Sequence, residues 1–246
     1  MCWRLVEAQH INSCRKITES TEDYDLLESE LEKIKPPVSE EFQNKHFLFF
    51  TPTRYKPYPA SRFRVSDSDH AVYYASEDVK TAVYECLFYK LKTFAASPDS
   101  GLPANWINKS AIKTPVKACR HLDLTKSPYV ELSNQWTDRK DYSCCIGLAD
   151  EAYKNDVELI RYQSVRDPEK GANLAIMRAS AFLEREPNVA GSWKVLFNKT
   201  NISLVCENPV QRFDISLDAF DYDEDIRKFV RSLRGDVFGE VLREDA

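Results

Sequence analysis

Apolar residues recur at helical spacing in two segments of the chain. In residues 20–35 they lie at steps of three, four and three residues: Tyr24, Leu27, Leu31 and Ile34. In residues 77–91 they form one face: Val79, Val83, Cys86, Leu87 and Leu91. Ser76 followed by two acidic residues is a helix start, and Pro36 and Pro37 end the first segment. Residues 138–154 and 223–243 are also predicted to be helical.

Short apolar runs predict the strands. Residues 47–50 and 71–75 are such runs, bounded by turn-forming residues. Further strands are predicted over residues 116–124, 157–163, 173–178, 194–198, 202–206 and 210–215. Strands and helices interleave without the regular alternation of a doubly wound parallel sheet. We therefore predict an α+β fold with central mixed or antiparallel β-sheets flanked by helices.

No repeat, low-complexity tract or long linker divides the 246 residues. The simplest division is an N-terminal helical extension over residues 1–44, packed on the core, and one globular unit over residues 45–246. The acidic helix predicted in the extension is typical of a solvated arm, and it could also form a surface for a partner.

Composition excludes several classes of function. A net charge of −5 leaves no overall basic field for direct binding of nucleic acid. The six glycines form no phosphate-binding motif, and the seven cysteines and four histidines show no metal-ligand spacing. We expect no metal centre and reduced thiols. No apolar stretch is long enough to span a membrane, so we predict a cytoplasmic protein.

Arginines gather in a proline-rich loop between the first two predicted strands. Arg54 and Tyr55 come first, and Arg62 follows. Guanidinium groups can hold phosphate oxygens with two hydrogen bonds each, so the loop could bind a diphosphate. The alternative is that these arginines solvate the loop or pair with Asp67 and Asp69.

Two further residues are candidates for chemistry. Glu85 lies at the edge of the apolar face of the predicted helix 77–91, either as a boundary residue paired with a cation or as a charge held in a partly dry cleft. Ser164 lies where a predicted strand enters a polar turn. It lacks the motif of a nucleophilic serine, so it could donate a hydrogen bond to a ligand or be an ordinary turn residue.

These stretches together resemble the RES-domain family, which takes its name from an arginine, a glutamate and a serine. The resemblance rests on Thr51–Tyr55, Ser61–Phe63, Val72–Ser76, Thr81–Glu85, Tyr162–Arg166 and Gly171–Asn173. The family's three residues match Arg62, Glu85 and Ser164, and Tyr74 matches an aromatic residue of the family's pocket. The chain departs from the family pattern at Arg64, where a glycine is expected, and at Tyr84, where a small residue is expected.

The resemblance implies a fold similar to ADP-ribosyltransferase toxins and an activity that destroys NAD+ by phosphorolysis or hydrolysis of the nicotinamide–ribose bond. Glu85 would stabilise the positive charge that builds on the ribose, as in glycoside cleavage. Arg62, with Arg54 and Tyr55, would bind the diphosphate, Tyr74 would contact the nicotinamide riboside, and Ser164 would orient the ligand. NAD+ is then the substrate, no cofactor is needed, and inorganic phosphate is a candidate co-substrate.

Members of this family typically act as toxins, so the resemblance also implies a protein antitoxin that covers the pocket; a homodimer is a further option. Two other functions stay open at this point. The same pocket could serve a protein ADP-ribosyltransferase, or the chain could be a non-catalytic interaction module that binds a partner through residues 20–35 and its aromatic surface.

Overall fold

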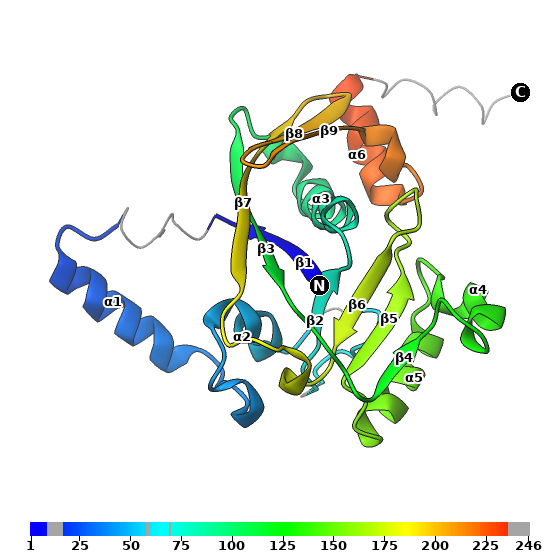
Figure 1. Ribbon diagram of the computed structural model, residues 1–246. Coiled ribbons are helices and arrows are strands. Elements are labelled where there is room, and N and C mark those ends of the chain that lie inside the picture. Colours follow the sequence, from blue (N-terminus) through cyan, green and yellow to red (C-terminus); the bar gives the residue numbers. More distant parts are fainter. Residues whose placement is uncertain (9–16, 58–59, 69, 236–246) are drawn as a thin grey trace, which may run out of the picture.

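A computed structural model describes residues 1–8, 17–57, 60–68 and 70–235 (Figure 1). Its centre is a nine-stranded sheet in the order β4-β5-β6-β2-β1-β3-β7-β8-β9. The strands are β1 (Cys2–Glu7), β2 (Tyr73–Ser76), β3 (Ile107–Thr114), β4 (His121–Asp123), β5 (Leu159–Gln163), β6 (Ala172–Ile176), β7 (Asn188–Phe197), β8 (Asn201–Glu207) and β9 (Val210–Ser216). All neighbouring strands are antiparallel except β4 and β5, so the predicted α+β class is confirmed.

The sheet is weakly joined at its middle. Strands β1 and β2 meet at one residue pair, Trp3 opposite Ser76. By contrast, β1 pairs with β3 along its whole length, and β2 pairs with β6 along its whole length. The sheet therefore consists of two halves that separate beside β1 and β2, and Figure 1 shows the β7–β9 edge and the β4–β6 edge on opposite sides of this junction.

The described residues form six helices: α1 (Thr21–Ile34), α2 (Phe47–Arg54), α3 (Val79–Ala95), α4 (Ser133–Trp136), α5 (Ser143–Lys154) and α6 (Glu224–Arg234). Helix α3 begins where the side chain of Asp78 accepts a hydrogen bond from the amide of Thr81. Its apolar face, including Leu87 and Leu91, is buried against β1, β7–β9 and α6. This helix therefore follows the junction of the two half-sheets and is firmly held there.

The prediction of a strand over residues 47–50 is wrong, because this segment begins α2. A short apolar run does not by itself distinguish a strand from a buried helix. Here the His46 side chain accepts a hydrogen bond from the amide of Leu48 and caps the helix, while Phe49 is buried against Tyr73 and Phe182.

The remaining helices and strands agree with the predictions to differing degrees. The predicted strand over residues 116–124 is reduced to β4, and the predicted helix over 138–154 begins only at Ser143. Helix α6 ends at Arg234, and the left-handed conformation of Gly235 terminates it. The rest of the predicted helix over 223–243 lies outside the described residues. Two central strands, β1 and β3, were not predicted.

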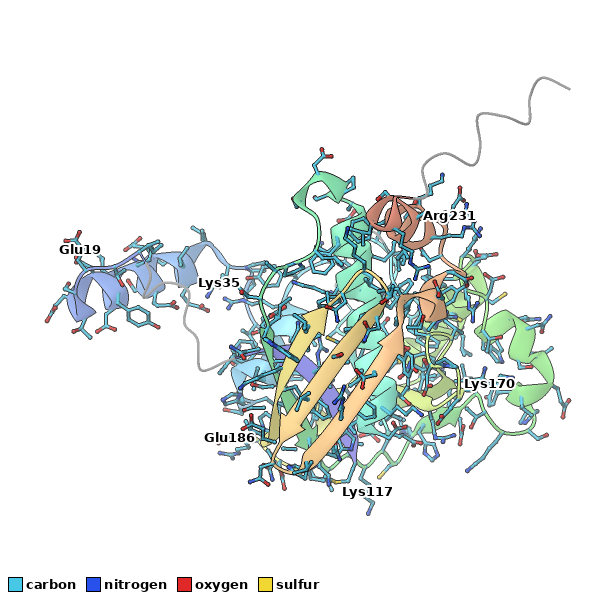
Figure 2. All side chains as sticks on the ribbon, turned by 90° about the horizontal axis from the view of Figure 1, so that it is seen from above. Glu19, Lys35, Lys117, Lys170, Glu186 and Arg231 are labelled. Atoms are coloured by element: carbon cyan, nitrogen blue, oxygen red, sulfur yellow. The ribbon has the colours of Figure 1, made fainter. Side chains whose placement is uncertain are left out.

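The predicted N-terminal helical extension over residues 1–44 is not confirmed as a unit. Strand β1 lies in the middle of the sheet, between β2 and β3. Helix α1 forms as predicted, with Ser20 as its cap, but none of its residues is buried. Figure 2 shows the segment between Glu19 and Lys35 standing away from the body of the molecule. The boundary at residues 44 and 45 stays a prediction.

Candidate functional site

A cavity of about 760 Å³ lies at the junction of the two half-sheets. Its walls come from β1 and α2, from β2 and α3, and from the loops that carry Arg62, Tyr142 and Arg166. This volume is in the range of pockets that bind small molecules and cofactors. The weak pairing of β1 with β2 therefore opens the sheet at the place where most of the candidate residues meet.

Glu85 lines this cavity, and its carboxylate is held by neutral donors. Ser164 Oγ donates to Glu85 Oε1 at 2.7 Å, and Asn173 Nδ2 donates to the same oxygen at 2.6 Å. Both donors are buried, with 1% and 2% of their surfaces exposed. Among the described residues, no cation pairs with Glu85 and Oε2 accepts no hydrogen bond. The carboxylate is thus oriented through one oxygen while its charge is not neutralised by a direct ion pair.

Local structure fixes both donors. Ser164 follows β5, and its Oγ accepts hydrogen bonds from the amides of Arg166 and Asp167, each at 3.1 Å, so the hydroxyl hydrogen is directed to Glu85. Asn173 lies on β6 opposite Ser76 of β2, whose hydroxyl donates to Asn173 Oδ1 at 2.7 Å. Because this oxygen accepts from Ser76, the amide nitrogen faces Glu85.

The turn between β5 and β6 packs tightly against the start of α3. Thr81 Oγ1 lies 2.8 Å from Asp78 Oδ2 and 2.7 Å from Asp167 Oδ2. A side chain on Gly171 would place its Cβ 2.0 Å from Thr81 Oγ1, so only glycine fits this close approach. The turn that carries Ser164 is therefore tied to the helix that carries Glu85.

Tyr74 lines the same cavity from β2. Its hydroxyl lies 2.9 Å from Ser61 Oγ and accepts a hydrogen bond from the amide of Phe63 at 3.0 Å. Burial raises the pKa of Tyr74 to about 12, so the phenol is neutral at physiological pH. Tyr74 therefore shapes the loop before β2 and presents an uncharged aromatic ring.

Arg62 is also in the cavity wall, and it is buried. Its Nη1 donates to the carbonyl of Trp136 at 2.7 Å and its Nη2 to the carbonyl of Asp138 at 2.8 Å. The guanidinium lies 4.7 Å from the ring centre of Tyr142. These contacts fix its orientation, and no carboxylate among the described residues forms an ion pair with it.

The structure brings further basic residues to the cavity that the sequence did not assign. Among the described residues, its lining contains five basic side chains and two carboxylates: Arg4, Arg62, Lys90, Lys109 and Arg166 with Glu7 and Glu85. Glu7 pairs with Lys109 at 2.6 Å. Arg4 donates to the carbonyl of Tyr74 at 3.0 Å and lies over the ring of Tyr73. The cavity therefore carries a surplus of positive charge, which suits an anionic ligand.

Two predicted site residues lie elsewhere. Arg54, at the end of α2, forms an ion pair with Glu32 of α1 at 2.6 Å. Tyr55 is 46% exposed on the following loop. Neither residue lines the cavity. The structure thus brings together Arg62, Tyr74, Glu85 and Ser164, and it does not bring Arg54 and Tyr55 to them.

Sequence reasoning missed Arg4 because β1 was not recognised as a strand, so nothing placed it near the loop of Arg62. Asn173 belonged to a motif but received no role, and its position opposite Ser76 depends on strand register. Its one signal in the sequence was a short polar side chain inside an otherwise apolar run.

A carboxylate without an ion-pair partner, in a cavity lined by basic residues, can stabilise a cation that develops on a ligand which itself carries phosphate groups. Comparison with protein-family models matches residues 39–198 to the RES domain. The comparison with curated proteins finds no match. The matched segment contains Arg62, Tyr74, Glu85 and Ser164, whereas β1 and everything after β7 lie outside it.

Proposed function

The chain belongs to the RES domain family, and from this premise we propose that it degrades NAD+ by cleaving the bond between nicotinamide and ribose. Membership supports a toxin-like, NAD-related role at the level of the family. The α+β architecture with its mixed sheet is consistent with the ADP-ribosyltransferase-like fold that the resemblance implies.

The observation that carries the proposal is the environment of Glu85. Its carboxylate receives hydrogen bonds from Ser164 and Asn173 on one oxygen, and it shares a cavity with five basic side chains. Cleavage of NAD+ needs both features. The diphosphate of NAD+ is anionic, and positive charge develops on the ribose as the bond to nicotinamide breaks. A site with the carboxylate alone would not bind the diphosphate, and a site with the basic side chains alone would not stabilise the ribose cation.

In the proposed reaction, the electrons of the glycosidic bond leave with nicotinamide, which departs as a neutral base. Positive charge then develops on the ribose, and Glu85 stabilises it. Ser164 and Asn173 keep the carboxylate oriented, so little reorganisation is needed at the transition state. Arg62 binds the diphosphate and Tyr74 contacts the nicotinamide riboside.

The acceptor is water or inorganic phosphate. When water forms the new bond to the anomeric carbon, it loses a proton and the product is ADP-ribose. When phosphate forms that bond, the product is ADP-ribose 1″-phosphate. No resident cofactor or metal takes part in either version of the proposal.

A protein antitoxin that covers the cavity, a homodimer and a cytoplasmic location belong to the same proposal. The opening of the cavity between the half-sheets is a surface that such a partner could close. Every helix in the described part of the chain is too short or too polar to span a lipid bilayer.

The test is to incubate the purified protein with NAD+, with and without inorganic phosphate, and to separate the products by chromatography. We expect nicotinamide together with ADP-ribose or its 1″-phosphate. Intact NAD+ would contradict the proposal and favour an interaction module. Nicotinamide release that depends on added cell extract, with ADP-ribose found on protein by mass spectrometry, would favour a protein ADP-ribosyltransferase.

A further inference from the structure

A second arginine is built into the cavity wall beside Arg62. Arg166 lines the cavity, yet only 6% of its surface is exposed. Its Nη2 donates to the Tyr142 hydroxyl at 3.2 Å. Among the described residues, no carboxylate lies within ion-pair distance of its guanidinium. Because an unpaired buried charge is costly, the fold must hold this cation by other means.

Aromatic rings hold it. The Arg166 guanidinium lies 3.7 Å from the ring centre of Phe88 on α3 and 5.6 Å from that of Tyr222. The two rings are nearly parallel, with an angle of 12° and centres 6.0 Å apart. Such stacking orients a guanidinium and leaves its net charge in place.

Tyr142 links Arg166 to Arg62. The ring of Tyr142 lies under the Arg62 guanidinium, and its hydroxyl accepts from Arg166. Two guanidinium groups thus converge on one phenol in the wall of the same cavity. Two adjacent cations without carboxylate partners are suited to phosphate oxygens, which accept hydrogen bonds from the planar fork of an arginine.

Tyr222 comes from the C-terminal segment, outside the matched RES domain. It lies between β9 and α6, and α6 packs against α3 (Figure 1). Lys92 of α3 forms ion pairs with Asp223 at 3.2 Å and with Asp225 at 2.6 Å, which fix this turn beside Phe88. The C-terminal segment therefore completes the surroundings of Arg166.

We propose that Arg166 binds a phosphate group of the ligand and that Tyr222 is a positioning residue for it. This inference rests on the proposed function for the identity of the ligand. It refines that function by adding a second cation to the anion site. The phosphate group belongs either to the diphosphate of NAD+ or to free inorganic phosphate.

The test measures binding of ADP-ribose and of inorganic phosphate separately, by calorimetry, to folded variants. Arg166→Gln should weaken binding of one probe about tenfold or more, as expected for loss of a charge-assisted hydrogen bond. Arg166→Lys, which keeps the charge and loses the planar fork, should fall between wild type and Arg166→Gln. Weakened ADP-ribose binding assigns the contact to the diphosphate, and weakened phosphate binding alone assigns it to the free anion.

Tyr222 is tested by a matched pair. Tyr222→Phe keeps the ring and should bind within about twofold of wild type, whereas Tyr222→Leu removes the aromatic face and should weaken the same probe about three- to tenfold. These two variants also serve if Arg166→Gln does not fold. Circular dichroism establishes that each variant compared is folded.

Unchanged binding of both probes by Arg166→Gln, or equal binding by Tyr222→Leu and Tyr222→Phe, would overturn the inference. Binding of neither probe by the wild-type protein would also overturn it. If the wild-type protein binds ADP-ribose through Arg166 but leaves NAD+ intact, the proposed function fails and the inference stands.

Discussion

Arginines outside the cavity differ from those in the cavity in the groups that hold them. Outside the cavity, Arg161 pairs with Glu77 at 2.7 Å and with Asp123 at 3.2 Å. The exposed Arg212 pairs with Asp214, and Arg54, whose side chain is buried, pairs with Glu32. In the cavity, carbonyl groups and aromatic rings hold Arg62 and Arg166, and no carboxylate among the described residues pairs with either.

This difference separates arginines held in structural ion pairs from those that we propose bind the ligand. A carboxylate neutralises an arginine and leaves little for a ligand to gain, whereas a carbonyl or a ring fixes its direction and preserves its charge. The cationic loop identified in the sequence is thus divided: Arg54 is neutralised by α1, and Arg62 is available to an anion. The lack of a carboxylate partner therefore indicates a ligand-binding arginine better than its place in the sequence does.

The largest effect is expected at Glu85, a cavity carboxylate with no ion pair among the described residues. Glu85→Gln should reduce NAD+ turnover at least about a hundredfold, because the amide removes the charge that stabilises the ribose cation. The shape of the side chain is nearly unchanged, so the protein should fold normally. Steady-state kinetics with NAD+ and circular dichroism measure the two quantities.

The matched control is Glu151→Gln, which removes an exposed carboxylate paired with Lys154 on α5. It should leave turnover unchanged. Near-normal turnover by folded Glu85→Gln would refute the catalytic assignment.

Removing charge from one arginine of each kind tests the comparison directly. Arg62→Gln should weaken NAD+ binding about 10- to 100-fold, equivalent to the loss of a hydrogen bond to a charged group. Arg212→Gln, which removes a surface arginine paired with Asp214, should bind NAD+ as the wild type does. Calorimetry at low ionic strength measures both, and equal affinities for the two variants would contradict the phosphate role of Arg62.

Packing of the cavity wall should also differ from packing of the surface. Gly171→Ala should lower the free energy of unfolding by about 1–3 kcal/mol, because the new Cβ overlaps Thr81 and Asp167. Gly147 lies exposed in α5 with no atom near the position of its Cβ, so Gly147→Ala should raise the free energy of unfolding by about 0.5–1 kcal/mol. Urea denaturation measures both, and a stable Gly171→Ala variant would mean that the turn is looser than described.

Among the effects on binding and activity, the smallest is expected when Glu85 keeps its charge and loses one of its two donors. Ser164→Ala should reduce kcat about tenfold, since Asn173 still holds the carboxylate. On the surface, Ser203 donates to Asp214 at 2.6 Å, and Ser203→Ala should leave kcat unchanged. A loss by Ser164→Ala as large as that of Glu85→Gln would show that Ser164 acts on the substrate itself.

Much of the fold was predictable from local pattern. Helix α3 and strands β5, β6, β8 and β9 follow from periodicity and from apolar runs bounded by turn residues. Strand β1 was missed because its six residues mix apolar and charged side chains, and β3 because polar residues such as Asn108 and Lys109 interrupt it. Both strands form through pairing with distant segments, which leaves no local pattern.

The candidate site was predictable in part. Motifs in the sequence indicated Arg62, Tyr74, Glu85 and Ser164, and all four line the cavity or bond directly to a residue that does. Arg54 stands close to Arg62 in sequence, but the helical conformation of residues 47–54 turns it towards Glu32. Residues close together in sequence can therefore face different partners in the folded chain.

Local chemistry in the chain is enough to specify the helix that carries Glu85, the polar turn that carries Ser164 and the arginine-rich loop before β2, because each depends on residues close together in sequence. The surplus of positive charge, the fixed carboxylate and the aromatic support of Arg166 arise only in the folded molecule. They require β1 beside β2, Ser76 opposite Asn173, and Tyr222 beside Phe88, and these contacts join segments more than seventy residues apart.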